Sequence, residues 1–179
     1  AIAGLGVAFP LIMIISAFAS LIGMGGAPRA AIRMGEGNNT EAEKILNNSF
    51  IALVLISIAL TVFFYLTKTQ LLTWFGATEN MLPFANSYFS VYLIGTLFVQ
   101  ISLGLNQFIS AQGFARTSMM TVVIGALMNI VLDPIFIYGF GMGVKGAALA
   151  TIISQMVSAV WVMMFLCGKR SIIRINKRF

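Results

Sequence analysis

Residues 129–155 read NIVLDPIFIYGFGMGVKGAALATIISQ, and this stretch decides which kind of fold the chain can form. An apolar segment with one carboxylate, Asp133, leads into a glycine-rich turn, and a second apolar segment follows. Glycine clusters between apolar segments mark turns. Extended in both directions, each segment reaches the length of about 20 mostly apolar residues that a helix needs to cross a bilayer. The stretch therefore predicts a hairpin of two membrane-spanning helices.

The rest of the chain has the same apolar character. Of its 179 residues, 59% are hydrophobic and 9% are charged, whereas soluble domains are about 25% charged. Backbone groups in lipid must be hydrogen-bonded within their own segment, so long apolar stretches predict helices. We therefore expect an all-α, polytopic transmembrane bundle. Its five spans are predicted at about residues 2–27, 45–67, 83–111, 117–140 and 144–167.

The composition also argues against several classes of function. The chain has no histidine and a single cysteine, Cys167, so a disulfide framework within this chain and the usual zinc sites are excluded. The net charge of +6 does not indicate nucleic-acid binding, because the basic residues lie between apolar blocks and not on one face. We expect no enzyme, no cofactor, no transition metal and no nucleic-acid partner.

The distribution of basic residues predicts an orientation in the membrane. If the first connecting loop is cytoplasmic, that side carries nine basic residues and the opposite side two, which is the bias expected of cytoplasmic loops. The nine are Arg29, Arg33, Lys44, Arg116, Lys169, Arg170, Arg174, Lys177 and Arg178, and the two are Lys68 and Lys145. We expect a multi-pass protein of the cell membrane in which residues 1–168 form a partial lobe and residues 169–179 a basic cytoplasmic linker. Because five spans would start outside and end inside, we also expect an earlier helix that completes a repeat of six.

Asp133 is the only acidic side chain inside any predicted span, and the one lysine in a span, Lys145, lies at the very start of the last one. A charge at the centre of a bilayer costs about 2.5–3.5 kcal/mol on insertion scales and usually marks an ion or proton pathway. Asn129 lies one helical turn earlier on the same face. Pro134 follows directly, and because proline removes a backbone donor it favours a helix kink. The alternative is an aspartate close enough to the helix end to reach the headgroups.

Thr151 is the partner that we expect from the second helix of the hairpin. Asp133 lies nine residues before Met142, at the centre of the turn, and Thr151 lies nine residues after it. Equal distances from the turn place the two at equal depth. A carboxylate, an amide and a hydroxyl form an all-oxygen group that suits a hard cation such as sodium, although the carboxylate could instead carry a proton. For Thr151, simple helix-to-helix hydrogen bonding is an equal alternative.

Further polar side chains on the third predicted span could line a substrate cavity. Tyr88, Gln100 and Asn106 are the candidates, and they lie on more than one face of the helix. Such an arrangement suits a helix surrounded by protein or bordering a cavity. Taken one by one, polar residues in spans more often join helices together.

Four segments of this sequence resemble the multidrug and toxic compound extrusion (MATE) exporters. They are GLGVAFPLIMIISAF (4–18), GMGGAPRAAIRMGEGN (23–38), FISAQGFARTSMM (108–120) and NIVLDPIFIYGFGMGVKGAALATIISQ (129–155). The resemblance implies helices two to six of a twelve-helix antiporter that exports amphipathic or cationic drugs in exchange for sodium or protons. It also implies a cation site that includes Asp133, Asn129 and Thr151. The missing first helix, which in similar proteins adds an aspartate to this site, and a C-terminal lobe would be the partners of this chain, together with the lipid bilayer and small-molecule drugs.

Three alternatives compete with the exporter. A lipid-linked oligosaccharide flippase of the same superfamily would be expected to line its cavity with several basic residues, whereas the predicted spans contain no arginine and a single lysine, Lys145, at the very start of the last span. An integral membrane enzyme would be expected to place several acids or histidines at one depth. A non-catalytic membrane subunit remains the third alternative, in which Asp133 has only a structural role.

Overall fold

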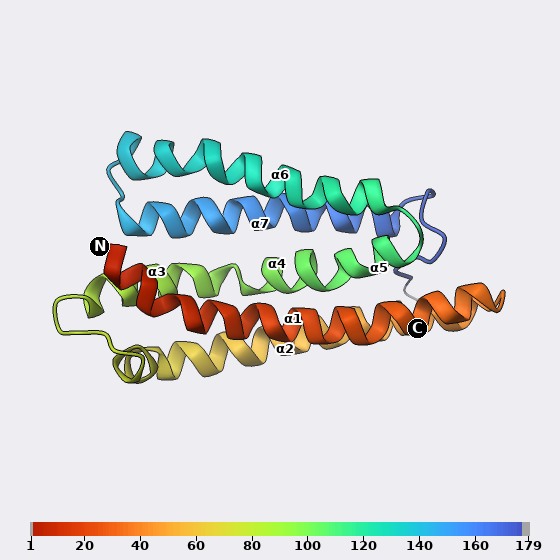
Figure 1. Cartoon of the computed structure of the whole chain (residues 1–179), viewed down its shortest axis with the longest axis horizontal. Coiled ribbons are helices and arrows are strands. Elements are labelled where there is room, and N and C mark those ends of the chain that lie inside the picture. The colour runs from red at the N-terminus through yellow and green to blue at the C-terminus, as the bar shows by residue number, and fades with distance from the viewer. Residues whose placement is uncertain (1, 177–179) are drawn as a thin grey trace.

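The computed structural model describes residues 2–176, and this part of the chain is helical without any strand. Figure 1 shows long helices lying side by side along one axis, with the α6–α7 hairpin stacked on the layer that contains α1 and α3 to α5. The elements are α1 (Ile2–Gly35), α2 (Asn39–Trp74), α3 (Leu82–Ile94), α4 (Thr96–Gln100), η1 (Ile101–Leu105), α5 (Asn106–Ala111), α6 (Ala115–Pro134), η2 (Ile135–Gly139) and α7 (Val144–Cys167). The two segments η1 and η2 are π-helical turns. The predicted all-α membrane bundle is therefore confirmed.

Four of the helices are long and apolar enough to cross a membrane by themselves, and a fifth span is formed by a bent pair. The prediction of one helix over 83–111 misses this break, where the axes of α3 and the following segment differ by 64°. The break lies at Gly95, where a Cβ atom would approach Ile152 of α7 to 2.6 Å. The chain bends there because glycine leaves room for close packing that another residue would obstruct.

The buried core consists of two apolar clusters along the bundle. One cluster surrounds Phe89 and Leu11 near the α3 end, and the other surrounds Leu105 and Phe108 near the opposite end. Large apolar side chains such as Leu66 are strongly exposed on the outside, as expected of a surface that faces lipid. α6 differs from its neighbours because Ser118 and Thr121 are its only buried residues.

The basic segment after α7 folds back onto the helix ends. The Gln112 side-chain oxygen Oε1 accepts hydrogen bonds from the Ser171 hydroxyl (3.0 Å), the Ile172 amide (2.7 Å) and the Ile173 amide (3.2 Å). Asn47 of α2 donates to the Arg174 carbonyl and accepts from the Asn176 amide. Ile173 is fully buried. Residues 171–176, predicted as part of a linker, are therefore anchored to the bundle, whereas residues 177–179 lie outside the described part of the chain.

Candidate functional site

The α6–α7 hairpin is closed by a turn that only glycine accommodates. Gly141 and Gly143 have positive φ angles of 63° and 56°, a region that side-chain-bearing residues rarely adopt. Gly146, at the start of α7, lies so close to η2 that a Cβ atom would come within 2.7 Å of the Phe136 carbonyl oxygen. These three glycines bring the two helices side by side and set the register between them.

The polar stripe predicted on α6 faces α7. Asn129 Nδ2 donates a long hydrogen bond of 3.4 Å to Thr151 Oγ1, and the Thr151 hydroxyl in turn donates to the Ala147 carbonyl at 3.0 Å. Two turns further along, the Ser158 hydroxyl donates to the Thr121 carbonyl at 3.1 Å. The structure therefore joins Asn129 and Thr151, which are two of the three residues that we expected at a cation site.

Asp133 lies one turn from this pair and remains unsatisfied. Its Oδ1 atom is buried and has no hydrogen-bond partner among residues 2–176. The Tyr88 hydroxyl of α3 interacts with Thr151 and is subject to the charge of the Asp133 carboxylate. An unsatisfied buried polar group costs about 1–3 kcal/mol. One oxygen of this half-buried carboxylate is thus left without a partner from residues 2–176.

Pro134 ends α6, and the π-helical turn η2 begins at the next residue. Proline has no N–H to donate to the carbonyl four residues earlier, so the α-helical ladder cannot continue unchanged. π-helical turns are rare and occur frequently at functional sites. The distortion that we predicted from Pro134 therefore takes the form of a widened turn beside Asp133.

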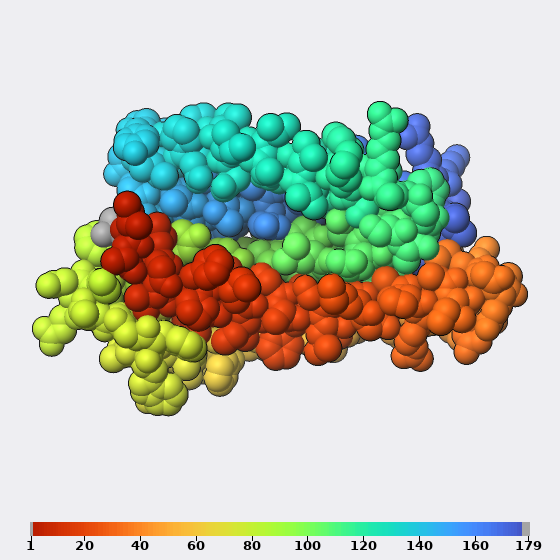
Figure 2. Space-filling model, viewed as in Figure 1, coloured from red at the N-terminus to blue at the C-terminus, as the bar shows by residue number. Residues whose placement is uncertain are grey.

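A cleft of about 290 Å³ opens below the Asn129–Thr151 pair, between α6, α7 and the broken third span. Figure 2 shows the surface hollowed where these elements meet. Polar side chains supply much of its wall: Ser102, Asn106, Thr121, Asn129, Thr151, Ser154, Gln155 and Ser158. Most of the exposed lining is nevertheless apolar, so the cleft combines polar side chains with an apolar surface and suits an amphipathic molecule.

The three predicted substrate-cavity residues have different positions. Asn106 lines the cleft and donates to the Ser118 carbonyl at 3.2 Å. Tyr88 stacks on Tyr92 beside Thr151 and lies near the cation candidates. Gln100 lies outside the cleft, where it is fully buried and donates to the Ile15 carbonyl of α1 at 2.7 Å. The position of Gln100 therefore fits helix packing and not substrate contact.

Ser102 and Gln155 form a pair in the wall of the cleft that was not predicted from the sequence. Ser102, on the π-helical turn η1, donates to Gln155 Oε1 of α7 at 2.5 Å. The pair joins the third span to the hairpin at the wall of the cleft. The spacing of four residues between Ser102 and Asn106 indicates that they share a helix face, and this could have pointed to Ser102. No sequence pattern predicts the π-helical turn or its contact with α7.

The donor atoms around Asp133 suit a hard cation or a proton. Carboxylate, amide, hydroxyl and carbonyl oxygens are the ligands of alkali and alkaline-earth ions. Among the described residues, no group of three or more His, Cys, Asp or Glu side chains could hold a metal ion. The group at Asp133 is therefore a single carboxylate with an amide and a hydroxyl one turn away.

The comparison with known families decides which class of protein has this arrangement. The family model MatE matches residues 1–135, which is well over half of the chain. The chain belongs to the MATE family. The resemblance that four sequence segments indicated is thereby confirmed.

Individual MATE relatives agree with the family model. The chain is 27% identical to the FAD transporter of Shewanella oneidensis over 88% of this chain and 36% of the relative. It is 28% identical to the multidrug export protein MepA of Staphylococcus aureus over 98% of this chain and 39% of the relative. The chain therefore spans under two fifths of the length of these relatives.

Solved MATE structures have the same fold. A MATE protein in the bent conformation matches with a TM-score of 0.94 and 32% identity over 98% of this chain and 40% of the other. An inward-facing MATE transporter matches with a TM-score of 0.94 and 32% identity, over 98% of this chain and 40% of the solved chain. An outward-facing MATE transporter matches with a TM-score of 0.93 and 31% identity, over 99% of this chain and 40% of the solved chain.

Proposed function

We propose that the protein containing this chain is a secondary active antiporter that exports amphipathic or cationic drugs in exchange for sodium ions or protons. The chain forms helices two to six of its N-terminal lobe. Asp133 is the coupling carboxylate, and Asn129 and Thr151 assist it. Residue Tyr88 lies beside this group, and Asn106 contributes to the substrate cleft.

The buried, unsatisfied oxygen of Asp133 is the observation that carries this proposal. A carboxylate at this depth is costly unless it binds an ion, carries a proton or finds a partner. The hydrogen-bonded Asn129–Thr151 pair lies one turn away and supplies neutral oxygens. The polar cleft next to it provides space for a second ligand. Two ligands that favour different packings of the lobe are what coupling requires.

The orientation belongs to the same proposal. The loop between α1 and α2 and the basic segment after α7 face the cytoplasm, because nine of the eleven basic residues lie on that side. The turn at Met142 then faces outward, and Asp133 lies closer to the outer surface. A cation therefore reaches Asp133 from outside, whereas drug enters the cleft from the inside.

Transport by the full-length protein in vesicles tests the proposal. Efflux of a fluorescent cationic dye should follow an imposed sodium or proton gradient. Asp133→Asn should reduce the gradient-dependent rate at least tenfold, because the amide can neither carry the charge nor release a proton. Glu79→Gln is the matched control, since Glu79 is exposed in the α2–α3 loop. Wild-type gradient dependence in Asp133→Asn would contradict the coupling role.

Thr151 is tested by a pair of substitutions. Thr151→Ser keeps the hydroxyl that accepts from Asn129, and Thr151→Val removes it with little change in volume. We expect weaker cation dependence for the valine variant alone. Equal effects of both substitutions would indicate a packing role for Thr151.

A further inference from the structure

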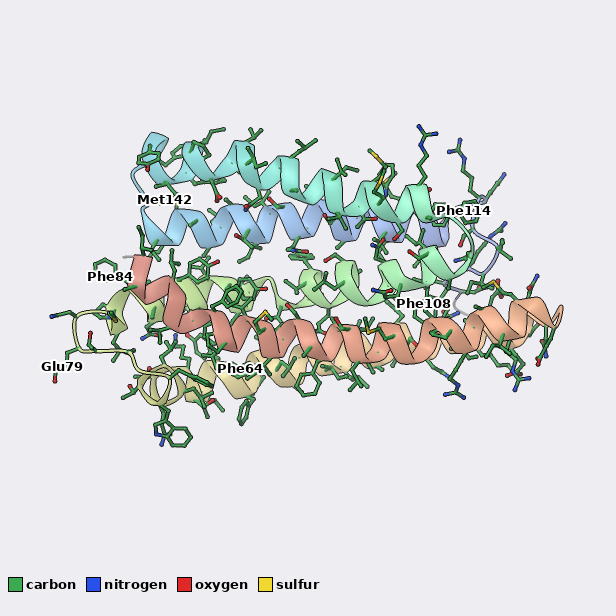
Figure 3. All side chains as sticks on the ribbon, in the orientation of Figure 1. Phe64, Glu79, Phe84, Phe108, Phe114 and Met142 are labelled. Carbon is green, nitrogen blue, oxygen red and sulfur yellow. The ribbon has the colours of Figure 1, made fainter. Side chains whose placement is uncertain are left out.

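A second cleft lies at the other end of the α6–α7 hairpin and shares no residue with the polar one. It has a volume of about 550 Å³ and is lined by Phe114, Trp161, Met164, Phe165, Lys169 and Arg170, together with Thr117 and Gly168. Figure 3 shows Phe114 at the end of the bundle opposite to Met142. The cleft therefore lies at the basic end, with apolar walls and two cations at its rim.

The apolar walls are held in place by contacts of their own. The Trp161 indole N–H donates to the Thr117 carbonyl of α6 at 3.3 Å. The rings of Phe114 and Phe165 meet edge to face, with their centroids 5.0 Å apart. Met164 is 69% exposed and leaves an apolar surface along the outside of α7. The cleft is thus preformed and open along one side to the surroundings of the bundle.

Lys169 and Arg170 are exposed and unpaired. The ion pairs within residues 2–176 are Arg33–Glu36 and Lys44–Glu41, and neither involves these two cations. Their backbone is nevertheless fixed, because the Arg174 guanidinium donates to the Lys169 carbonyl at 3.1 Å. The following residues are anchored on Gln112. Two positive charges are thus held at the rim of an apolar cleft, and no carboxylate of residues 2–176 forms an ion pair with them.

We propose that this cleft binds one anionic phospholipid. The phosphate lies between Lys169 and Arg170, and an acyl chain follows Trp161 and Met164 toward the middle of the bilayer. Basic pockets between transmembrane helices on the cytoplasmic side are suited to acidic lipid headgroups, and tryptophan is enriched at the membrane interface. The choice of the inner leaflet rests on the orientation proposed above.

The positive charge at the rim of the cleft favours an anionic lipid over the cationic drugs that we propose are transported. A cationic drug is repelled by Lys169 and Arg170, whereas an anionic amphiphile is attracted by them and shielded from water by the same walls. A small anion such as phosphate gains the charge contact but leaves the apolar walls exposed. The cleft therefore favours a molecule with a negatively charged head and an apolar tail.

Native mass spectrometry of the full-length protein tests the binding. We expect phosphatidylglycerol to bind more tightly than phosphatidylcholine. The double variant Lys169→Gln/Arg170→Gln should weaken phosphatidylglycerol binding about thirtyfold, because basic residues near anionic lipid contribute about 1 kcal/mol each. Arg29→Gln/Arg33→Gln, which removes two charges at the same end of the bundle, is the matched control and should bind like the wild type. Equal affinity for both lipids, or equal effects of both double variants, would overturn the proposal.

A fluorophore attached at Met164→Cys, in a background without Cys167 and other reactive cysteines, tests where the lipid lies. Brominated phosphatidylglycerol should quench it, and excess inorganic phosphate should not reverse the quenching. Reversal by phosphate would overturn the lipid assignment in favour of a simple anion site. A label that neither brominated phosphatidylglycerol nor brominated phosphatidylcholine quenches would show that another part of the protein covers the cleft, and would also overturn the proposal.

The binding assays have no transport readout, so their failure is distinguishable from failure of the antiporter proposal. Asp133→Asn should bind phosphatidylglycerol as the wild type does.

Discussion

Asp133 illustrates how one side chain determines the chemistry of this bundle. Its buried Oδ1 has no partner within residues 2–176, and the cost of leaving it unsatisfied is comparable to a large share of a protein's net stability. Neutralisation by a cation or a proton removes that cost. In the proposed function, the stability of this region therefore depends on the cation or proton that binds Asp133, and this dependence is what would couple the ion to a change of packing.

Gly146 tests the packing that brings the site residues together. Gly146→Ala places a Cβ atom 2.7 Å from the Phe136 carbonyl oxygen, so α7 must shift away from η2. We expect a loss of about 1–3 kcal/mol in stability, seen as a lower Tm of the full-length protein in detergent. The matched control is Gly139→Ala, where a Cβ atom meets nothing within 4 Å. Equal Tm values for the two variants would contradict the tight η2–α7 contact.

At the scale of elements, two irregular segments position the functional side chains. The break at Gly95 and the π-helical turn η1 allow the third span to present Tyr88 on one side of the break and Ser102 on the other. The segment after α7 forms the second case, because its hydrogen bonds to Asn47 of α2 and to Gln112, which follows α5, join these helices to the end of α7. Neither the break at Gly95 nor the segment after α7 is regular α-helix. The break packs against the Ile152 side chain, and the segment after α7 is hydrogen-bonded to Gln112 and Asn47.

Gln112→Leu should release the segment that follows α7. One oxygen atom accepts all three hydrogen bonds from Ser171, Ile172 and Ile173, and leucine replaces it with a group that accepts none. Loss of these bonds costs about 1–3 kcal/mol locally. We expect faster trypsin cleavage after Arg174 in the full-length protein.

The exposed residue Gln70 supplies the control for this prediction. Gln70→Leu changes the same type of side chain at a position far from the anchored segment, and its cleavage rate should match the wild type. Cleavage after Arg174 at the wild-type rate in both variants would mean that the anchoring contacts add nothing to the local stability.

At the scale of the molecule, the described helices behave as one lobe. They superpose about equally well on inward-facing and outward-facing relatives, with TM-scores of 0.94 and 0.93. A lobe that fits both states changes little internally, so the proposed alternating access requires movement of the lobe against the rest of the protein. α6 is almost unburied within the described residues, which leaves its surface available for contacts with lipid or with another part of the protein.

The orientation can be tested with single cysteines in a full-length background without other reactive cysteines. Lys145→Cys, in the Met142 turn, should react with a membrane-impermeant maleimide in intact cells. Glu36→Cys, in the loop between α1 and α2, should react only after permeabilisation. This follows from the excess of basic residues on the Glu36 side. The reverse labelling pattern would invert the proposed direction of cation entry.

Some features of this chain followed from its sequence alone. The apolar lengths predicted the spans, and the glycine-rich turn predicted the α6–α7 hairpin. Equal distance from Met142 predicted that α7 brings Thr151 to the depth of Asp133, on the side of α7 that faces α6. These features depend on length, periodicity and composition, which are properties of a segment and its immediate neighbours.

Only the tertiary structure decided the remaining features. It paired Thr151 with Asn129 and left Asp133 unsatisfied, placed Gln100 against α1, broke the third span at Gly95, and anchored residues 171–176 on Gln112 and Asn47. The physical reason is that each depends on a contact between residues far apart in the chain. Such contacts depend on the shapes of two surfaces that pack together, and the local sequence of one segment does not predict the shape of the other.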